Sequence, residues 1–125
     1  MRMLLDTHVF LWHTKSDRKL TTKSRAMIQN AVEVYVSSAS IWEATIKARL
    51  GKLDVNIDDL VKAISSSGFL ELPITAEHAA ATDRLADLHR DPFDRILLAQ
   101  AITEPLTFLT ADERLKDYSR LVIII

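Results

Sequence analysis

Short apolar runs alternate with helix-like stretches along the whole chain, and this alternation constrains the fold more than any other feature. The apolar runs are Met3 to Leu5, Val32 to Val36, Phe69 to Leu72, Leu106 to Leu109 and Leu121 to Ile125. Runs this short and this apolar are typical of strands that are buried on both faces. The pattern therefore predicts the α/β class: a three-layer α/β/α sandwich with a central parallel sheet of about five strands.

Helix signals fill the intervals between the predicted strands. Residues 37–40 offer hydroxyl side chains for an N-cap, and Gly51 supplies a stop. Thr75 and Pro92 mark two further helix starts. Helices are predicted over Val9 to Trp12, between Thr22 and Ala31, between Ser40 and Gly51, over Ile57 to Ser67, over Ala76 to Leu88 and over Phe93 to Thr103.

Composition narrows the class of protein further. The 125 residues are 48% hydrophobic and 26% charged, which predicts a single globular domain over residues 1–125. The absence of cysteine excludes disulfides and thiolate zinc sites. No apolar run reaches the length of a membrane span and no leader pattern is present, so we expect a cytoplasmic protein without membrane association.

The charge balance bears on nucleic acid as a partner. With 16 basic and 17 acidic residues, the net charge is −1. Domains that grip nucleic acid by charge alone are usually strongly basic. Binding of nucleic acid by this chain would need a local basic rim, bound metal ions or a second subunit.

Four carboxylates occur where the predicted elements meet one edge of the sheet. Asp6 and Asp112 follow the first and fourth predicted strands, and Glu43 and Asp94 lie in the first turns of two predicted helices. The carboxyl ends of parallel strands and the beginnings of the helices that follow them share one edge, where ligands bind in such folds. The sequence therefore predicts that these four side chains come together.

Clustered carboxylates repel one another unless a cation neutralises them. Hard ions such as Mg²⁺ and Mn²⁺ prefer oxygen ligands and can promote attack of water on phosphorus. Zinc is disfavoured, because the chain has no cysteine and no histidine pair at ligand spacing. Phosphodiester hydrolysis is the reaction class that follows.

Each carboxylate also has a structural interpretation that needs no metal. Asp6 could cap the helix that begins near His8, Glu43 could form a capping box with Ser40, Asp91 and Asp94 could stabilise a helix dipole, and Asp112 could cap a short helix through Leu115.

Four segments together resemble one family. They are Leu4-Leu5-Asp6-Thr7, residues 38–43 (Ser-Ala-Ser-Ile-Trp-Glu), residues 91–95 (Asp-Pro-Phe-Asp-Arg) with Ala99 and Ala101 behind them, and residues 109–112 (Leu-Thr-Ala-Asp). In this order, and over essentially the whole chain, they resemble PIN-domain ribonucleases, specifically the VapC-type toxins of type II toxin–antitoxin systems. The fold of that family is the parallel sheet flanked by helices predicted above.

The resemblance implies a set of site residues. Asp6, Glu43, Asp94 and Asp112 would be the catalytic and metal-binding acids, with Mg²⁺ or Mn²⁺ as cofactor. Asp6, Asp94 and Asp112 would be direct ligands, whereas Glu43 would complete the shell or orient the attacking water. The hydroxyls of Thr7 and Thr110 would support the carboxylates or a bound water, and Asp91 is a second candidate for the third acid.

The resemblance also implies an activity and partners. The chain would be an endoribonuclease that cleaves RNA, forms a homodimer and is silenced by an antitoxin protein whose tail blocks the acidic groove. A catalytically inactive PIN-like module that binds protein or RNA is the alternative. A receiver-type or phosphatase domain is disfavoured, because Thr7 and His8 follow Asp6 where a receiver carries a further acid.

Several other residues have open roles. Arg95 could contact a phosphate or pair with a neighbouring acid. The four histidines are expected at the surface or at caps, and the basic stretches around Arg18–Arg25 and Lys47–Lys52 could follow an RNA backbone or simply face solvent. Apolar residues of the early helix, including Val9, Phe10 and Trp12, could form a dimer or antitoxin surface.

Overall fold

A computed structural model describes residues 1–87 and 90–125 of the chain. Its strands are β1 Arg2–Leu5, β2 Glu33–Ser37, β3 Leu70–Leu72, β4 Thr107–Thr110 and β5 Val122–Ile124. Its helices are α1 Thr7–Thr14, α2 Thr22–Asn30, α3 Ser38–Arg49, α4 Ile57–Ser66, α5 Ala76–Ala81 and α6 Pro92–Thr103, with 3-10 helices η1 Thr82–Arg84 and η2 Glu113–Tyr118.

The strands form one sheet in the order β3-β2-β1-β4-β5, and every neighbouring pair is parallel. The register sets Leu4 beside Tyr35 of β2 and Leu5 beside Leu109 of β4. The chain builds outward from β1 to β3 on one side and then crosses to β4 on the other side. The predicted parallel five-stranded sheet is therefore confirmed.

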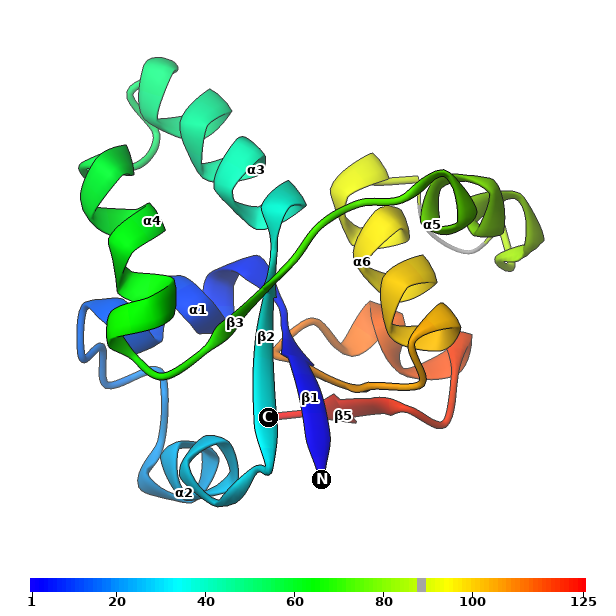
Figure 1. Cartoon of the computed structure of the whole chain (residues 1–125), viewed down its shortest axis with the longest axis horizontal. Coiled ribbons are helices and arrows are strands. Elements are labelled where there is room, and N and C mark those ends of the chain that lie inside the picture. Colours follow the sequence, from blue (N-terminus) through cyan, green and yellow to red (C-terminus); the bar gives the residue numbers. More distant parts are fainter. Residues whose placement is uncertain (88–89) are drawn as a thin grey trace.

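Apolar side chains cover both faces of the sheet. Met3 and Leu5 of β1 pack into one core cluster with residues of α1, α2, α3 and α4. Leu4, which points to the opposite face, packs into a second cluster with Leu97 and Leu98 of α6. Figure 1 shows these helix groups on opposite sides of the sheet. The α/β/α sandwich is confirmed, and its two buried faces explain why the strands have apolar sequences.

Glycine ends two of the helices as the sequence predicts. Gly51 follows α3 with a φ of 72°, its N–H bonds to Ala48 O at 3.1 Å, and Lys52 N–H bonds to Lys47 O at 2.9 Å. Gly68 follows α4 with a φ of 78°. This left-handed geometry satisfies the last helix carbonyls and favours glycine.

The prediction of one long helix from Ala76 to Leu88 is wrong. The α-helix ends at Ala81, η1 continues to Arg84, and Leu85 is extended with φ −75° and ψ 146°. Arg95 explains part of the break, because its guanidinium binds the carbonyls of Thr82 and Ala86, each at 3.0 Å. Leu85 meanwhile packs against the second core cluster. The predicted end at Leu88, and His89, lie outside the described residues.

The early helix does not present the predicted apolar surface. Val9 and Phe10 are fully buried in the first core cluster, so they cannot contact a partner. Trp12 is only partly buried and packs at the edge of that cluster. Among the described residues, no helix combines the length and the apolar character needed to cross a membrane.

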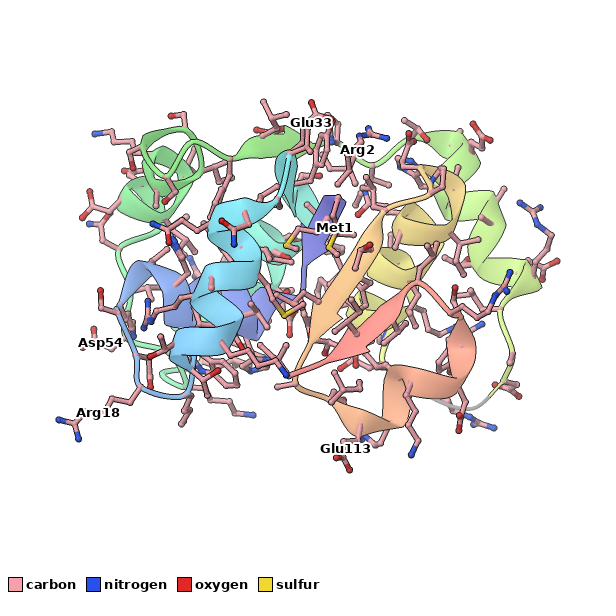
Figure 2. The ribbon with its side chains drawn as sticks, turned by 90° about the horizontal axis from the view of Figure 1, so that it is seen from below. Met1, Arg2, Arg18, Glu33, Asp54 and Glu113 are labelled. Carbon is pink, nitrogen blue, oxygen red and sulfur yellow. The ribbon has the colours of Figure 1, made fainter. Side chains whose placement is uncertain are left out.

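The amino ends of β1 and β2 carry an ion pair far from the predicted acidic edge. Arg2 Nε donates to Glu33 Oε1 at 2.7 Å, and the two labelled side chains lie close together in Figure 2. Glu113, at the start of η2, lies on the opposite side of that view.

Replacement of one core leucine tests the packing of the second face. Leu98→Ala should lower the free energy of unfolding by about 2–5 kcal/mol, because it removes a fully buried side chain. Leu50→Ala, at an exposed position after α3, should change it by less than about 0.5 kcal/mol. Urea unfolding followed by circular dichroism measures both, and equal effects would contradict the core assignment.

Candidate active site

The site lies at the point where the strand order reverses, between β1 and β4. β1 lies between β2 and β4, so the carboxyl ends of β1 and β4 are neighbours although 104 residues separate Asp6 from Thr110. The backbone N–H of Asp6 donates to Leu109 O at 2.9 Å and extends the ladder by one step. Crevices at such switch points are where open α/β sheets bind ligands.

Asp6 is a buried carboxylate, with only 5% of the residue exposed. Its Oδ1 accepts the N–H of Thr7 at 2.7 Å, and its Oδ2 accepts the Thr110 hydroxyl at 2.6 Å. Burial raises the pKa of Asp6, and the charge of Glu43 raises it slightly further, while the two hydrogen bonds and His8 oppose the shift. Asp6 caps α1, as its structural interpretation predicted. Since burial is the main cause of the raised pKa, a positive charge beside Asp6 would favour its ionised form.

The two threonines differ in what they contact. The Thr110 hydroxyl donates to Asp6 and accepts the N–H of Asp112 at 3.1 Å, so it links two of the predicted acids. The Thr7 hydroxyl donates to Ser40 Oγ at 2.8 Å, and only its backbone N–H reaches Asp6. Thr7 therefore ties α1 to α3 and does not place its hydroxyl on a carboxylate.

Glu43 lies on α3 with its side chain 7% exposed. Lys47, one turn later, places Nζ 2.9 Å from Glu43 Oε2. The capping box predicted between Ser40 and Glu43 is wrong, because the N-cap is Ser37, whose hydroxyl accepts the N–H of Ala39. Glu43 is thus a buried acid paired with a cation.

The beginning of α6 supplies two further acids. Asp91 is its N-cap, and Asp91 Oδ1 accepts the N–H of Phe93 at 2.9 Å and that of Asp94 at 3.3 Å. Pro92 fits the first helical position, where no N–H is needed. The cap fixes the first turn and so positions Asp94, while one Asp91 oxygen is already occupied by the cap.

Asp112 follows β4 and caps η2, as its structural interpretation predicted. Its Oδ1 accepts the N–H of Arg114 at 3.0 Å. The Arg114 guanidinium also binds both carboxylate oxygens, with Nη2 2.7 Å from Oδ2. Asp112 is therefore engaged by a bidentate cation at the mouth of the site.

These groups line one cavity of about 420 Å³, called the acidic cavity below. The cavity brings together all four predicted acids and Asp91, which come from four places in the chain: the end of β1, α3, the beginning of α6 and the end of β4. Its lining residues are Asp6, His8, Trp12, Glu43, Lys47, Asp91, Asp94, Ala111, Asp112 and Arg114. The predicted convergence of Asp6, Glu43, Asp94 and Asp112 at one edge agrees with this cavity.

The acidic cavity is not a finished metal site. Within residues 1–87 and 90–125, no three carboxylates or imidazoles are grouped closely enough to hold a metal ion. The donors nevertheless suit a hard divalent cation, since every predicted ligand is a carboxylate oxygen. The raised pKa of buried Asp6 is a second sign of a fit, because a cation would stabilise its ionised form.

Arg95 follows Asp94 in the first turn of α6. It binds the carbonyls of Thr82 and Ala86, and it is absent from the lining of the acidic cavity. These two hydrogen bonds hold the segment before α6. The two roles predicted for Arg95, contact with a phosphate and pairing with a neighbouring acid, stay predictions.

Sequence reasoning missed two cations of the cavity. Lys47 was grouped with a basic stretch, although its four-residue offset from Glu43 is a recognisable ion-pair spacing. Arg114 was not singled out, and its two-residue offset from Asp112 gives no comparable signal. His8 and Trp12 also line the cavity, whereas buried His78 completes a capping box with Thr75 and bonds to Glu104.

Comparison with known proteins shows the family of the chain. The family model described as PIN domain matches residues 3–121. The chain belongs to the PIN-domain family. It is 26% identical over 122 residues to Ribonuclease VapC22 of Mycobacterium tuberculosis (strain ATCC 25618 / H37Rv), covering 93% of this chain and 91% of that protein. The resemblance to VapC-type PIN proteins is thereby confirmed.

A solved structure shares the fold. It is a chain of VapBC2 from Rickettsia felis, in a crystal structure with a DNA fragment from the promoter, with a TM-score of 0.69 and 16% identity. The match covers 100% of this chain and 98% of that one. The shared architecture therefore extends over this whole chain and over 98% of the other.

The burial of Asp6 predicts an unusual dependence of stability on pH. Because the pKa is higher in the folded protein than in the unfolded chain, ionised Asp6 destabilises the fold above the folded-state pKa, and this cost disappears as pH falls below the unfolded value. Without divalent ions, Asp6→Asn should therefore be more stable than wild type at neutral pH. The difference should shrink on acidification.

Thermal unfolding in EDTA between pH 3 and pH 8 measures this difference. Asp117→Asn, at an exposed position on η2, is the matched control and should follow the wild type. A difference between Asp6→Asn and wild type that did not change with pH, or that grew on acidification, would contradict the raised pKa.

Proposed function

We propose that the chain is a Mg²⁺- or Mn²⁺-dependent endoribonuclease and the toxin of a toxin–antitoxin pair, acting in the cytoplasm as a homodimer with one PIN-like domain over residues 1–125. The observation that carries the proposal is the acidic cavity, which joins Asp6, Glu43, Asp94 and Asp112 at the switch point of a PIN fold. The names of the relatives, a ribonuclease and a VapBC complex, support RNA as substrate and an antitoxin as partner.

Asp6, Asp94 and Asp112 are the residues proposed to hold the cation. When bound, the ion supplies Lewis-acid polarisation of the phosphodiester and positive charge that offsets its developing negative charge. Asp6 is fixed from both sides by Thr7 and Thr110, so its orientation is set before any ligand arrives. Asp94 is positioned by the Asp91 cap and Asp112 by the N–H of η2.

Glu43 has the role of orienting the attacking water and accepting its proton. It is buried at the wall of the cavity, where an ordered water could bridge it to the phosphodiester. Lys47 holds one oxygen, Oε2, and so fixes the direction of the carboxylate. The second oxygen, Oε1, is the one proposed to face the water.

Positive and aromatic groups near the cavity support binding of an RNA strand. Lys47 and Arg114 line it, and Lys19 lies 5.8 Å from the ring centroid of Trp12, which also lines it. Aromatic rings and cations are the groups that bind single-stranded RNA without strict sequence preference. Lys19, Lys47 and Arg114 would be the local basic groups that a chain of net charge −1 needs to bind RNA.

An exposed apolar area supports a protein partner. Trp42 is 61% exposed and packs edge-on against Phe93, with ring centroids 5.2 Å apart. The two rings border an apolar cavity of about 440 Å³ between α3 and α6. Such patches are typical of protein interaction sites, and a second copy or the antitoxin would cover this one.

The alternative, an inactive PIN-like module that binds protein or RNA, has one observation in its favour. Arg114 occupies both oxygens of Asp112, and the described residues contain no preassembled metal-binding group. In such a module the guanidinium would replace the metal permanently. Cleavage measurements separate the two functions.

The test is incubation of purified, partner-free protein with total cellular RNA in Mg²⁺, in Mn²⁺ and in EDTA. Wild type should give discrete fragments that EDTA abolishes, and Asp94→Asn should reduce the rate by at least roughly 100-fold, since even supporting residues of metal sites contribute 10–100-fold. Asp117→Asn is the matched control and should cleave normally. Absence of cleavage under every condition, with circular dichroism showing an intact fold, would favour the inactive module.

A further inference from the structure

Arg114 is an exposed cation held on a residue of the acidic cavity. Its side chain is 68% exposed, and that of Asp112 is 24% exposed. Nε lies 3.0 Å from Oδ1 and 3.2 Å from Oδ2, and Nη2 lies 2.7 Å from Oδ2. The guanidinium therefore uses both oxygens that a cation would need.

The same guanidinium lies in the field of several cavity acids. Its hydrogen bonds to Asp112 raise the pKa of Arg114 most, the charge of Asp112 adds to this, and the charges of Asp94 and Asp91 contribute further. Arg114 also lines the acidic cavity itself. It is thus placed to compensate the carboxylates collectively as well as to bind one of them.

This pairing is of a kind that competitors displace. An exposed ion pair contributes little to stability, because water and salt screen it. A divalent cation bound to the Asp112 carboxylate would deprive the guanidinium of its hydrogen-bond acceptor. The cation would also repel the positive charge of Arg114. The fork of arginine donors that fits a carboxylate also fits a phosphate.

Lys47 offers a contrast within the same cavity. Its partner Glu43 is 7% exposed, so loss of the ammonium would leave a buried carboxylate without this cation. Asp112 is more exposed and keeps the N–H of Arg114 as a donor when the guanidinium leaves. Of Lys47 and Arg114, Arg114 is therefore the cation that can leave its carboxylate with the smaller loss of stability.

We propose that Arg114 exchanges partners during the catalytic cycle: it holds Asp112 while the cavity is metal-free, and it binds a phosphate of the RNA strand once a divalent cation occupies that carboxylate. This inference rests on the proposed function and names a residue for RNA positioning that the predicted motifs do not include. It makes metal binding and RNA binding depend on the same side chain.

The first arm of the test measures Mn²⁺ affinity by titration calorimetry without RNA. Arg114→Gln should bind Mn²⁺ roughly two- to five-fold more tightly than wild type, since the competing ion pair is of that strength. Lys116→Gln, an equal charge change at an exposed position of η2, is the matched control and should bind like wild type. Arg114→Lys, which keeps the charge but loses the fork, should fall between wild type and Arg114→Gln.

The second arm measures binding of a single-stranded RNA oligonucleotide in Ca²⁺ and in EDTA at several salt concentrations. In Ca²⁺, Arg114→Gln should bind RNA more weakly than wild type, and the slope of log K against log salt should fall by about 0.7 for one lost phosphate contact. In EDTA the two proteins should bind RNA alike, because the guanidinium is then held by Asp112. Lys116→Gln should not show this dependence on the cation.

The possible outcomes separate this inference from the proposed function. A wild type that cleaves RNA, together with an Arg114→Gln protein of unchanged Mn²⁺ affinity, would overturn the exchange alone. An RNA-binding defect of equal size in Ca²⁺ and in EDTA would also overturn it, since Arg114 would then be a fixed contact. A wild type that neither binds Mn²⁺ nor cleaves RNA would overturn both.

Discussion

The buried carboxylate of Asp6 lies at the carboxyl end of the central strand, β1, and the rest of the site is arranged around it. The strand order makes β4 the neighbour of β1, so the Thr110 hydroxyl reaches Asp6 at 2.6 Å. Thr7, the first residue of α1, donates its backbone N–H to the other oxygen of Asp6. The Thr7 hydroxyl donates to Ser40 and so connects α3 to the start of α1. Burial raises the pKa of this carboxylate, so its ionised form lowers the stability of the metal-free protein, and the cation proposed above would offset that cost.

The distribution of charge in the acidic cavity gives it two kinds of counter-ion. Lys47 pairs with a buried acid and belongs to the permanent structure, whereas Arg114 pairs with a more exposed one at the mouth. Five acids, with these two cations and His8, line a single cavity of about 420 Å³. A site of this kind can stay folded without metal and still favour a divalent ion, which would explain why the metal-binding group is not preassembled in residues 1–87 and 90–125.

Much of the fold follows from the sequence, because buried parallel strands need apolar runs and helices need caps. The sheet, the glycine stops and the convergence of the four acids depend on such patterns. The pairing of Arg114 with Asp112 does not, because a two-residue offset has no recognisable pattern in the sequence. Contacts between distant residues accompany the failures. Arg95 binds the carbonyls of Thr82 and Ala86 just beyond the end of α5, and Ser40 bonds to Thr7 while Ser37 is the N-cap of α3. Local spacing does not show which side chains make such contacts. For the same reason Val9 and Phe10, which could have formed a surface, lie in the core.

The proposed cation site can be located most directly by anomalous diffraction from crystals grown with Mn²⁺. We expect an anomalous peak inside the acidic cavity, next to Asp6, Asp94 and Asp112, with the Arg114 guanidinium displaced from Asp112. A peak only outside this cavity, or none at a Mn²⁺ concentration that supports RNA cleavage, would contradict the assignment of these carboxylates as the metal-binding residues.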